Sequence, residues 1–197
     1  MLKRLATLLV LALLLTQAAP GLACVGRTLY LGSLKDNGDL LISEMISVLV
    51  TERTGTTIKI RPFDTQAQLY QALKATKEED RVDLMTENTA DALTFAKLPP
   101  GPSADQDFLT AKAYYEKNLD TIWLNPFGYS KEKAKPSVSA PLIRRDVLTN
   151  FPLLPRVLNK LSGAINDQDY QELLTAVNKG GNPKEVAKDF LKKHKLI

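Results

Sequence analysis

Strand-type runs alternate with amphipathic helical patterns between residues 28 and 97, and this alternation constrains the fold more than any other feature. The β-branched or apolar runs and the helical patterns that follow them are 28–32 and 40–53, 56–63 and 65–75, and 82–85 and 87–97. Strands that alternate with helices favour parallel pairing in a sheet covered by helices. The sequence therefore predicts an α/β fold, with Asp39 as the cap of the first helix and Gly55 as its end.

Polar residues follow the first and third predicted strands, and they define a candidate binding edge. In α/β sheets, ligands meet the loops at the carboxyl ends of the strands. The loops at 33–38 and 86–89 lie at this edge, and four of their side chains are expected to offer hydrogen bonds to a ligand: Ser33, Asn37, Asn88 and Thr89. Tyr129 follows Gly128 in a predicted loop and is the free aromatic candidate for contact with a cation.

The second half of the chain begins after a proline-rich break at residues 98–102. A capped helix, with Ser103 as its cap, and a strand at 121–124 precede a polar connector at 125–140. Trp123 is expected in the core, and one of Tyr114 and Tyr115 is expected to face it. Residues 141–197 predict one strand and three amphipathic helices, of which the last two begin near Asn166 and Asn182.

The first 23 residues read as a secretory signal peptide: a basic start, an apolar run from Leu5 to Leu15 and a small-residue exit. Cys24 is the only cysteine, so no disulfide can form within the chain. It stands where a bacterial lipoprotein carries its lipid-modified residue, although Gly21 replaces the usual Leu three residues earlier. Both a lipid anchor at Cys24 and a soluble secreted product remain open.

Composition argues against several functional classes. The formal net charge is +4, and no basic patch is interleaved with aromatic residues, so nucleic-acid binding is not expected. The single histidine, His194, lies in a lysine-rich helix end, which leaves no Ser-His-Asp or Cys-His set. One His and one Cys are too few for the usual metal sites, and glycine-rich phosphate loops are missing. We therefore expect no catalytic residues, no metal and no cofactor.

Several short motifs, taken in order and spacing, resemble the substrate-binding proteins of ABC importers for glycine betaine, choline, proline and related osmoprotectants. They are Leu31-Gly32-Ser33 through Ile42-Ser43-Glu44-Met45, Leu69-Tyr70-Gln71-Ala72-Leu73, Val82-Asp83-Leu84-Met85-Thr86-Glu87, Trp123-Leu124-Asn125-Pro126, Leu158-x-Lys160-Leu161-Ser162-Gly163-x-Ile165, and Pro183-x-Glu185-Val186-Ala187-x-Asp189-Phe190-Leu191. The resemblance covers almost all of the chain after Cys24. It implies a type II periplasmic-binding-protein-like fold with a mixed, mainly parallel sheet flanked by helices.

The chain also departs from that family. Members have two lobes, and the second is inserted where this chain has only residues 125–140. The resemblance therefore implies a single lobe over residues 24–197, with 125–140 as a short linker. The family's aromatic residue in "E-Y-T-G" is replaced by Asn88.

The function implied is a non-catalytic, extracytoplasmic solute-binding component, periplasmic or lipid-anchored on the outer side of the cytoplasmic membrane. Its ligand would be a quaternary ammonium or amino-acid-like solute, bound weakly by one lobe, and its partner an ABC permease. The alternative is an interaction protein that has lost transport and pairs with another protein or with itself through the former interlobe face.

Overall fold

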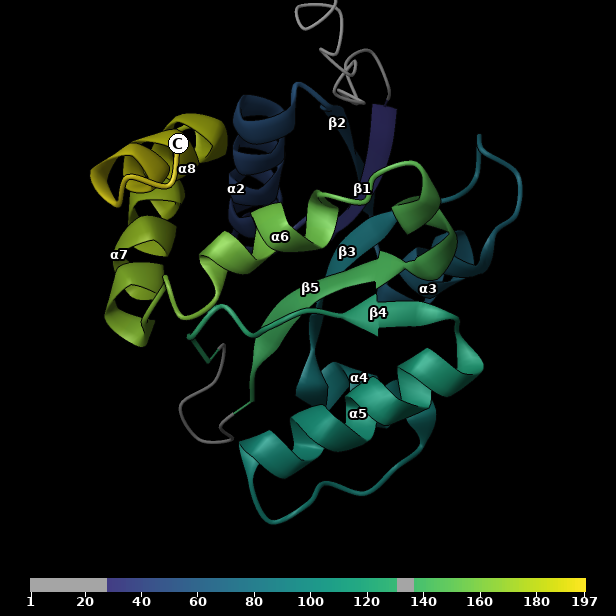
Figure 1. Ribbon diagram of the computed structural model, residues 1–197. Helices are drawn as coiled ribbons and strands as arrows, with labels where there is room; N and C mark the ends of the chain where they lie inside the picture. The colour runs from purple at the N-terminus through teal and green to yellow at the C-terminus, as the bar shows by residue number, and fades with distance from the viewer. Residues whose placement is uncertain (1–27, 131–136) are drawn as a thin grey trace, which may run out of the picture.

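The computed structural model describes residues 28–130 and 137–197, and residues 1–27, including Cys24 and the predicted signal peptide, lie outside that part. A five-stranded sheet in the order β2-β1-β3-β5-β4 forms its centre (Figure 1). The strands are β1 (Thr28–Leu34), β2 (Thr57–Phe63), β3 (Leu84–Asn88), β4 (Thr121–Trp123) and β5 (Ser139–Arg144). The helices are α2 (Asn37–Thr54), α3 (Gln66–Lys74), α4 (Thr89–Ala96), α5 (Ala104–Asn118), η1 (Arg145–Thr149), α6 (Leu154–Leu158), η2 (Asn159–Leu161), α7 (Asp167–Asn178) and α8 (Pro183–Lys193).

The sheet is mixed, as expected, and its parallel character is confined to one half. β1 pairs in parallel with β2 and with β3, whereas β5 runs antiparallel to both β3 and β4. The parallel half is made by the alternating strands and helices at the start of the chain. The antiparallel half is made by β5, which returns beside β3 after the chain has passed through α4, α5 and β4.

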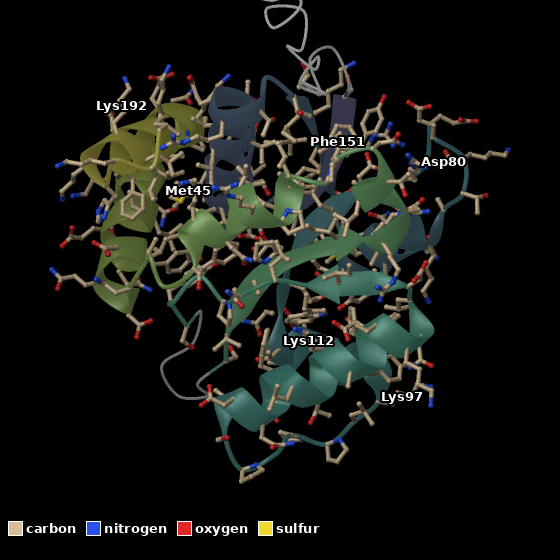
Figure 2. The ribbon with its side chains drawn as sticks, viewed as in Figure 1. Met45, Asp80, Lys97, Lys112, Phe151 and Lys192 are labelled. Carbon is tan, nitrogen blue, oxygen red and sulfur yellow. The ribbon has the colours of Figure 1, made fainter. Side chains whose placement is uncertain are left out.

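Helices cover both faces of the sheet, so the α/β prediction is confirmed. α2 and the C-terminal helices α6, α7 and α8 pack on one face, and α3, α4 and α5 pack on the other. Neighbouring residues of a strand point to opposite faces of the sheet, because side chains alternate along a strand. Leu84 packs in the core on the side of α2, and Met85 packs in the core on the side of α3, α4 and α5. Figure 2 shows buried Met45 of α2 in the core beneath the helices on the α2 side of the sheet, and exposed Lys192 on the outer side of α8.

The helix starts show where local sequence signals succeed and fail. Ser103, Asn166 and Asn182 cap α5, α7 and α8 as predicted, each accepting a hydrogen bond from a backbone N–H of the first turn. The predicted cap Asp39 is wrong, because α2 begins at Asn37, three residues before the predicted start at Leu40, and Asp36 accepts the bond from the Asp39 N–H. A polar side chain at either position can accept from the free N–H groups of a helix start, so the residue type alone does not fix where the helix begins.

The described parts of the connector, 125–130 and 137–140, are more buried than the polar composition predicted. Phe127 and Tyr129 are 0% and 2% exposed. The Phe127 N–H donates to the Ser139 carbonyl at 2.9 Å, and the Ile165 N–H donates to the Phe127 carbonyl at 3.2 Å. Residues 125–130 are thus tied to β5 and to the loop before α7, and Phe127 and Tyr129 belong to the core.

Among the helices of the described residues, none has the length and apolar character needed to cross a membrane.

Candidate functional site

The carboxyl ends of β1 and β3 meet at one edge of the sheet, as the sequence predicted. The two strands are parallel neighbours, with Leu31 opposite Leu84 and Gly32 opposite Met85. Each continues directly into a helix, β1 into α2 and β3 into α4, so two helix N-termini also lie at this edge. Helix N-termini present unpaired N–H groups and a partial positive charge. At both helices a side chain, Asp36 or Asn88, already accepts from a first-turn N–H, and a carboxylate, Asp39 or Asp91, lies in the first turn. The edge therefore combines polar side chains with two capped helix N-termini.

Ser33 and Asn37 stand at the β1 side of this edge. Ser33 is 2% exposed, and its hydroxyl donates to the neighbouring Leu34 carbonyl at 2.9 Å. Asn37 is exposed in the first turn of α2, and its amide donates to the Asn178 side chain of α7 at 2.7 Å. Of the two, Asn37 is the side chain that a solute could reach.

Asn88 and Thr89 lie at the β3 side, and their side chains form hydrogen bonds within the protein. The Asn88 side chain accepts from the Ala90 N–H at 2.9 Å and donates to the Ser137 and Ser139 hydroxyls at 3.0 and 3.1 Å. The Thr89 N–H donates to the Val138 carbonyl, and the Thr89 hydroxyl accepts from the Val138 N–H at 3.1 Å. Both side chains are buried, so they fasten the beginning of β5 to the end of β3.

Tyr129 does not occupy the free loop position that the sequence suggested. It is only 2% exposed and stacks on Tyr170 of α7, with ring centroids 4.1 Å apart and planes 10° from parallel. Burial raises the pKa of its hydroxyl well above the ordinary value. The expectation of an exposed ring is wrong, because Tyr170, 41 positions away in the chain, covers it. The predictions for Trp123 and Tyr115 are confirmed, since both are fully buried.

A buried carboxyl group, Glu87, lies one residue before Asn88 and was not selected from the sequence. It is 1% exposed; its Oε1 accepts from the Asn88 N–H at 2.9 Å, and its Oε2 lies 3.1 Å from the Tyr115 hydroxyl. That hydroxyl is also 2.9 Å from the hydroxyl of Tyr70. The alternation of β3 places Glu87 on the same face as Met85, and this period of two was the signal that could have revealed its burial.

Glu87 is held in its neutral form around neutral pH. Burial raises the pKa of this carboxyl to about 8; hydrogen bonds from Tyr70, the Asn88 N–H and Tyr115 oppose the rise, and the charge of Asp91 adds to it. A protonated carboxyl can donate as well as accept, which suits a cluster that otherwise contains two tyrosine hydroxyls. The cluster joins α3, β3 and α5 behind the candidate edge.

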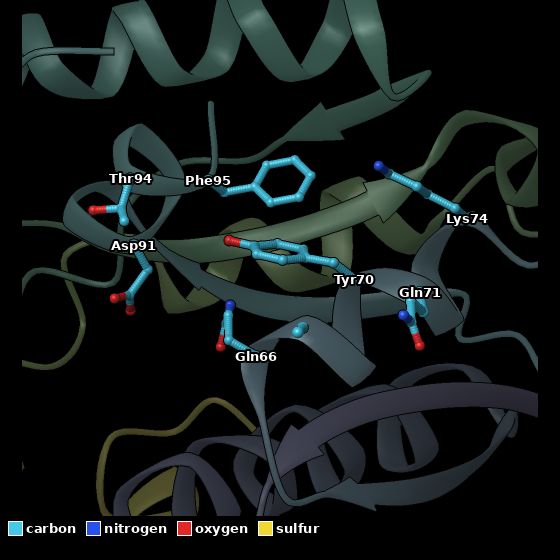
Figure 3. Close-up of a pocket in the computed structure, with 8 residues that line it drawn as sticks. Gln66, Tyr70, Gln71, Lys74, Asp91, Thr94 and Phe95 are labelled. Atoms are coloured by element: carbon cyan, nitrogen blue, oxygen red, sulfur yellow. The ribbon is translucent and has the colours of Figure 1, made fainter. Parts of the chain in front are cut away.

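A surface pocket lies between α3 and α4, beside this cluster (Figure 3). Its volume is about 470 Å³. The rings of Tyr70 and Phe95 form its wall, with centroids 4.0 Å apart, and the Lys74 ammonium lies 4.9 Å from the Phe95 centroid. None of the five ligand-contact residues predicted from the sequence lines it.

The part of the chain that the structure describes contains no group of three or more His, Cys, Asp and Glu side chains that could hold a metal ion. His194 ends α8 and stacks on Phe190, with ring centroids 4.1 Å apart.

Comparison with known proteins finds one family model that matches part of the chain. A family model described as the substrate binding domain of ABC-type glycine betaine transport system matches residues 130–193. A comparison with curated protein sequences finds no match.

Solved structures of solute-binding proteins show a similar fold over most of the chain. A crystal structure of a glycine betaine/carnitine/choline ABC transporter is 15% identical, with a TM-score of 0.77 over 86% of this chain and 98% of that one. Apo YehZ from Escherichia coli is 14% identical, with a TM-score of 0.72 over 86% and 99% of the two chains. A TRAP periplasmic solute binding protein from Ochrobactrum anthropi is 9% identical, with a TM-score of 0.50 over 86% and 90%.

The fold is therefore that of periplasmic solute-binding proteins. The resemblance to the substrate-binding proteins of glycine betaine-type ABC transporters, inferred from the sequence motifs, is confirmed.

Proposed function

We propose that the protein is an extracytoplasmic solute-binding component related to ABC importers of glycine betaine-type compatible solutes, and that it binds without catalysis. The observation that carries the proposal is the family match over residues 130–193. Its described part from residue 137 onward folds as β5 and the C-terminal helices onto the same sheet as β1 and β3. A quaternary ammonium or amino-acid-like solute is the proposed ligand, and an ABC permease is the proposed partner.

The proposed contact residues are the five at or near the carboxyl edge: Ser33, Asn37, Asn88, Thr89 and Tyr129. Asn37 is the exposed member and is the first to test. The N–H groups that the caps of α2 and α4 leave free would favour the carboxylate of a betaine or an amino acid. Ser33, Asn88, Thr89 and Tyr129 are buried, so a solute would reach them only if the residues that cover them moved.

The affinity is proposed to be weak, because the family resemblance implies that residues 125–140 replace an inserted second lobe. A ligand on one lobe keeps much of its surface in water, whereas tight pockets bury 70–90% or more of a small ligand. The proposed single lobe comprises residues 24–197.

Isothermal titration with choline, glycine betaine, carnitine and proline tests the proposal. We expect binding of at least one of them, and Asn37→Ala should weaken it. Asn178→Ala is the matched control, because it removes the same 2.7 Å hydrogen bond but leaves the predicted contact group in place. Binding to none of the four solutes would contradict the function, and tight binding by the monomer would contradict the weak half-site.

Export and anchoring are tested separately. Mass spectrometry of the protein recovered from bacterial membranes should show a chain that begins at Cys24, with added acyl mass if that residue is lipidated. Self-association through the former interlobe face stays a prediction, and light scattering on the processed protein tests it.

A further inference from the structure

The pocket between α3 and α4 has a charged side chain near each end and aromatic rings between them. Figure 3 shows Lys74 on one side of Tyr70 and Phe95, and Asp91 on the other. Among the described residues, neither charged group has an ion-pair partner within 4.0 Å, and the Lys74 ammonium lies over the ring of Phe95, 4.9 Å from its centroid. A positive and a negative group are thus both available to a ligand.

The aromatic wall is fixed from behind. The Tyr70 hydroxyl is 2.9 Å from that of Tyr115, which is bonded to the buried Glu87 carboxyl. Gln66, which also lines the pocket, reaches Oε1 of Glu87 at 3.5 Å. Because Tyr70 and Tyr115 are almost completely buried, this network holds the ring of Tyr70 in one orientation. The pocket therefore loses little freedom when a ligand packs against the ring.

We propose that this pocket is a second solute site, specific for a zwitterion whose ammonium and carboxylate lie at opposite ends of an apolar chain. The ammonium binds the Asp91 carboxylate and the carboxylate binds the Lys74 ammonium. The methylene body lies on Tyr70 and Phe95. The site is separate from the carboxyl edge and does not depend on the function proposed for it, since none of the edge residues lines the pocket.

The test uses 5-aminovalerate as the probe, with pentylamine and valerate as analogues that lack one charge each. Binding is measured by NMR titration of the processed chain, following the amides of α3 and α4. Exposed charge pairs contribute roughly 0.2–1 kcal/mol, so we expect 5-aminovalerate to bind up to about fivefold tighter than either analogue. Equal affinity for the three compounds, or no shifts in α3 and α4, would overturn the proposal.

Two charge-removing variants give a crossed pattern that a non-specific apolar site would not produce. Lys74→Gln should weaken the binding of 5-aminovalerate and of valerate and leave the binding of pentylamine unchanged. Asp91→Asn should weaken the binding of 5-aminovalerate and of pentylamine and leave the binding of valerate unchanged. Both side chains are exposed, so the fold should tolerate the changes. A uniform effect on all three compounds would contradict the assignment of the two ends.

Failure at this pocket is distinguishable from failure at the edge. Glycine betaine binding at the edge should be the same in the wild-type protein and in both variants. Conversely, Asn37→Ala should leave the shifts that 5-aminovalerate causes in α3 and α4 unchanged.

Discussion

The amide of Asn88 donates to the hydroxyl of Ser139 at 3.1 Å, and this bond joins the end of β3 to the beginning of β5. The two residues are 51 positions apart and directly opposite each other in the antiparallel pair. The chain therefore comes back to the candidate edge at a point fixed by side chains as well as by the strand ladder. The same asparagine caps α4, so one side chain sets the position of a helix and of a returning strand.

Replacing Asn88 with alanine should destabilise the protein by about 2–3 kcal/mol, because it removes a helix cap and leaves two buried hydroxyls short of a partner. Urea denaturation, followed by the fluorescence of the single tryptophan, Trp123, measures the change. Asn118→Ala is the control: that amide donates to the Tyr114 carbonyl on the exposed surface, and its loss should change the stability by less than about 0.5 kcal/mol. Equal effects of the two variants would show that Asn88 does not fasten the edge.

Replacing Thr89 with valine should cost about 1–3 kcal/mol, because it keeps the side-chain volume and deprives the Val138 N–H of its hydroxyl acceptor. Thr94→Val is the comparison, since the Thr94 hydroxyl donates to the Ala90 carbonyl on the exposed side of α4 and its loss should matter little. Hydrogen exchange should report faster exchange at the Val138 amide in Thr89→Val. Unchanged protection there would contradict the contact.

Gly128→Ala should be clearly more destabilising than Gly163→Ala. Gly128 has φ +113°, and a Cβ there would lie 2.9 Å from the Ile165 carbonyl oxygen and 3.0 Å from the Gly163 Cα, both backbone atoms. Gly163 has φ +62° with open space around a Cβ, so only the cost of a left-handed conformation applies, about 1–2 kcal/mol. Thermal unfolding of the two variants compares them. An equal loss would mean that residues 125–130 do not pack tightly on the loop before α7.

The buried Glu87 carboxyl should make the protein less stable as pH rises. Its ordinary pKa is 4.5, and burial raises the pKa to about 8 in the folded protein. Below pH 4.5 the group is protonated in both states, so it causes no penalty. Between 4.5 and about 8 the unfolded chain loses the proton and the folded chain keeps it, so the free energy of unfolding falls.

Glu87→Gln removes this titration and should flatten the decline in the free energy of unfolding between pH 5 and 8. Because the amide has a similar shape and stays neutral, the variant should gain most over the wild type near pH 8. Chemical denaturation at a series of pH values measures the slope. Glu79→Gln, at an exposed turn, should keep the wild-type slope, and an unaltered slope in Glu87→Gln would rule out the buried acid as its source.

The sequence alone determined the elements whose signals are local. The strand and helix alternation of residues 28–97 predicted the parallel half of the sheet, because periods of 2 and 3.6 are fixed by backbone geometry. Ser103, Asn166 and Asn182 predicted their helix starts, because a cap bonds to N–H groups only two or three residues away. The convergence of the β1 and β3 ends also followed, since parallel neighbours end at the same edge.

Only the tertiary structure decided which of the edge residues are exposed. Tyr129 follows a glycine in a loop, but Tyr170 of α7 covers its ring; Asn88 and Thr89 carry polar groups, but Ser137–Ser139 occupy them. Glu87 is buried because Tyr115, 28 positions later, comes to lie against it. The burial of each of these side chains depends on how β5, α5 and α7 dock against β3, and docking between distant segments leaves no local periodicity to read in the sequence.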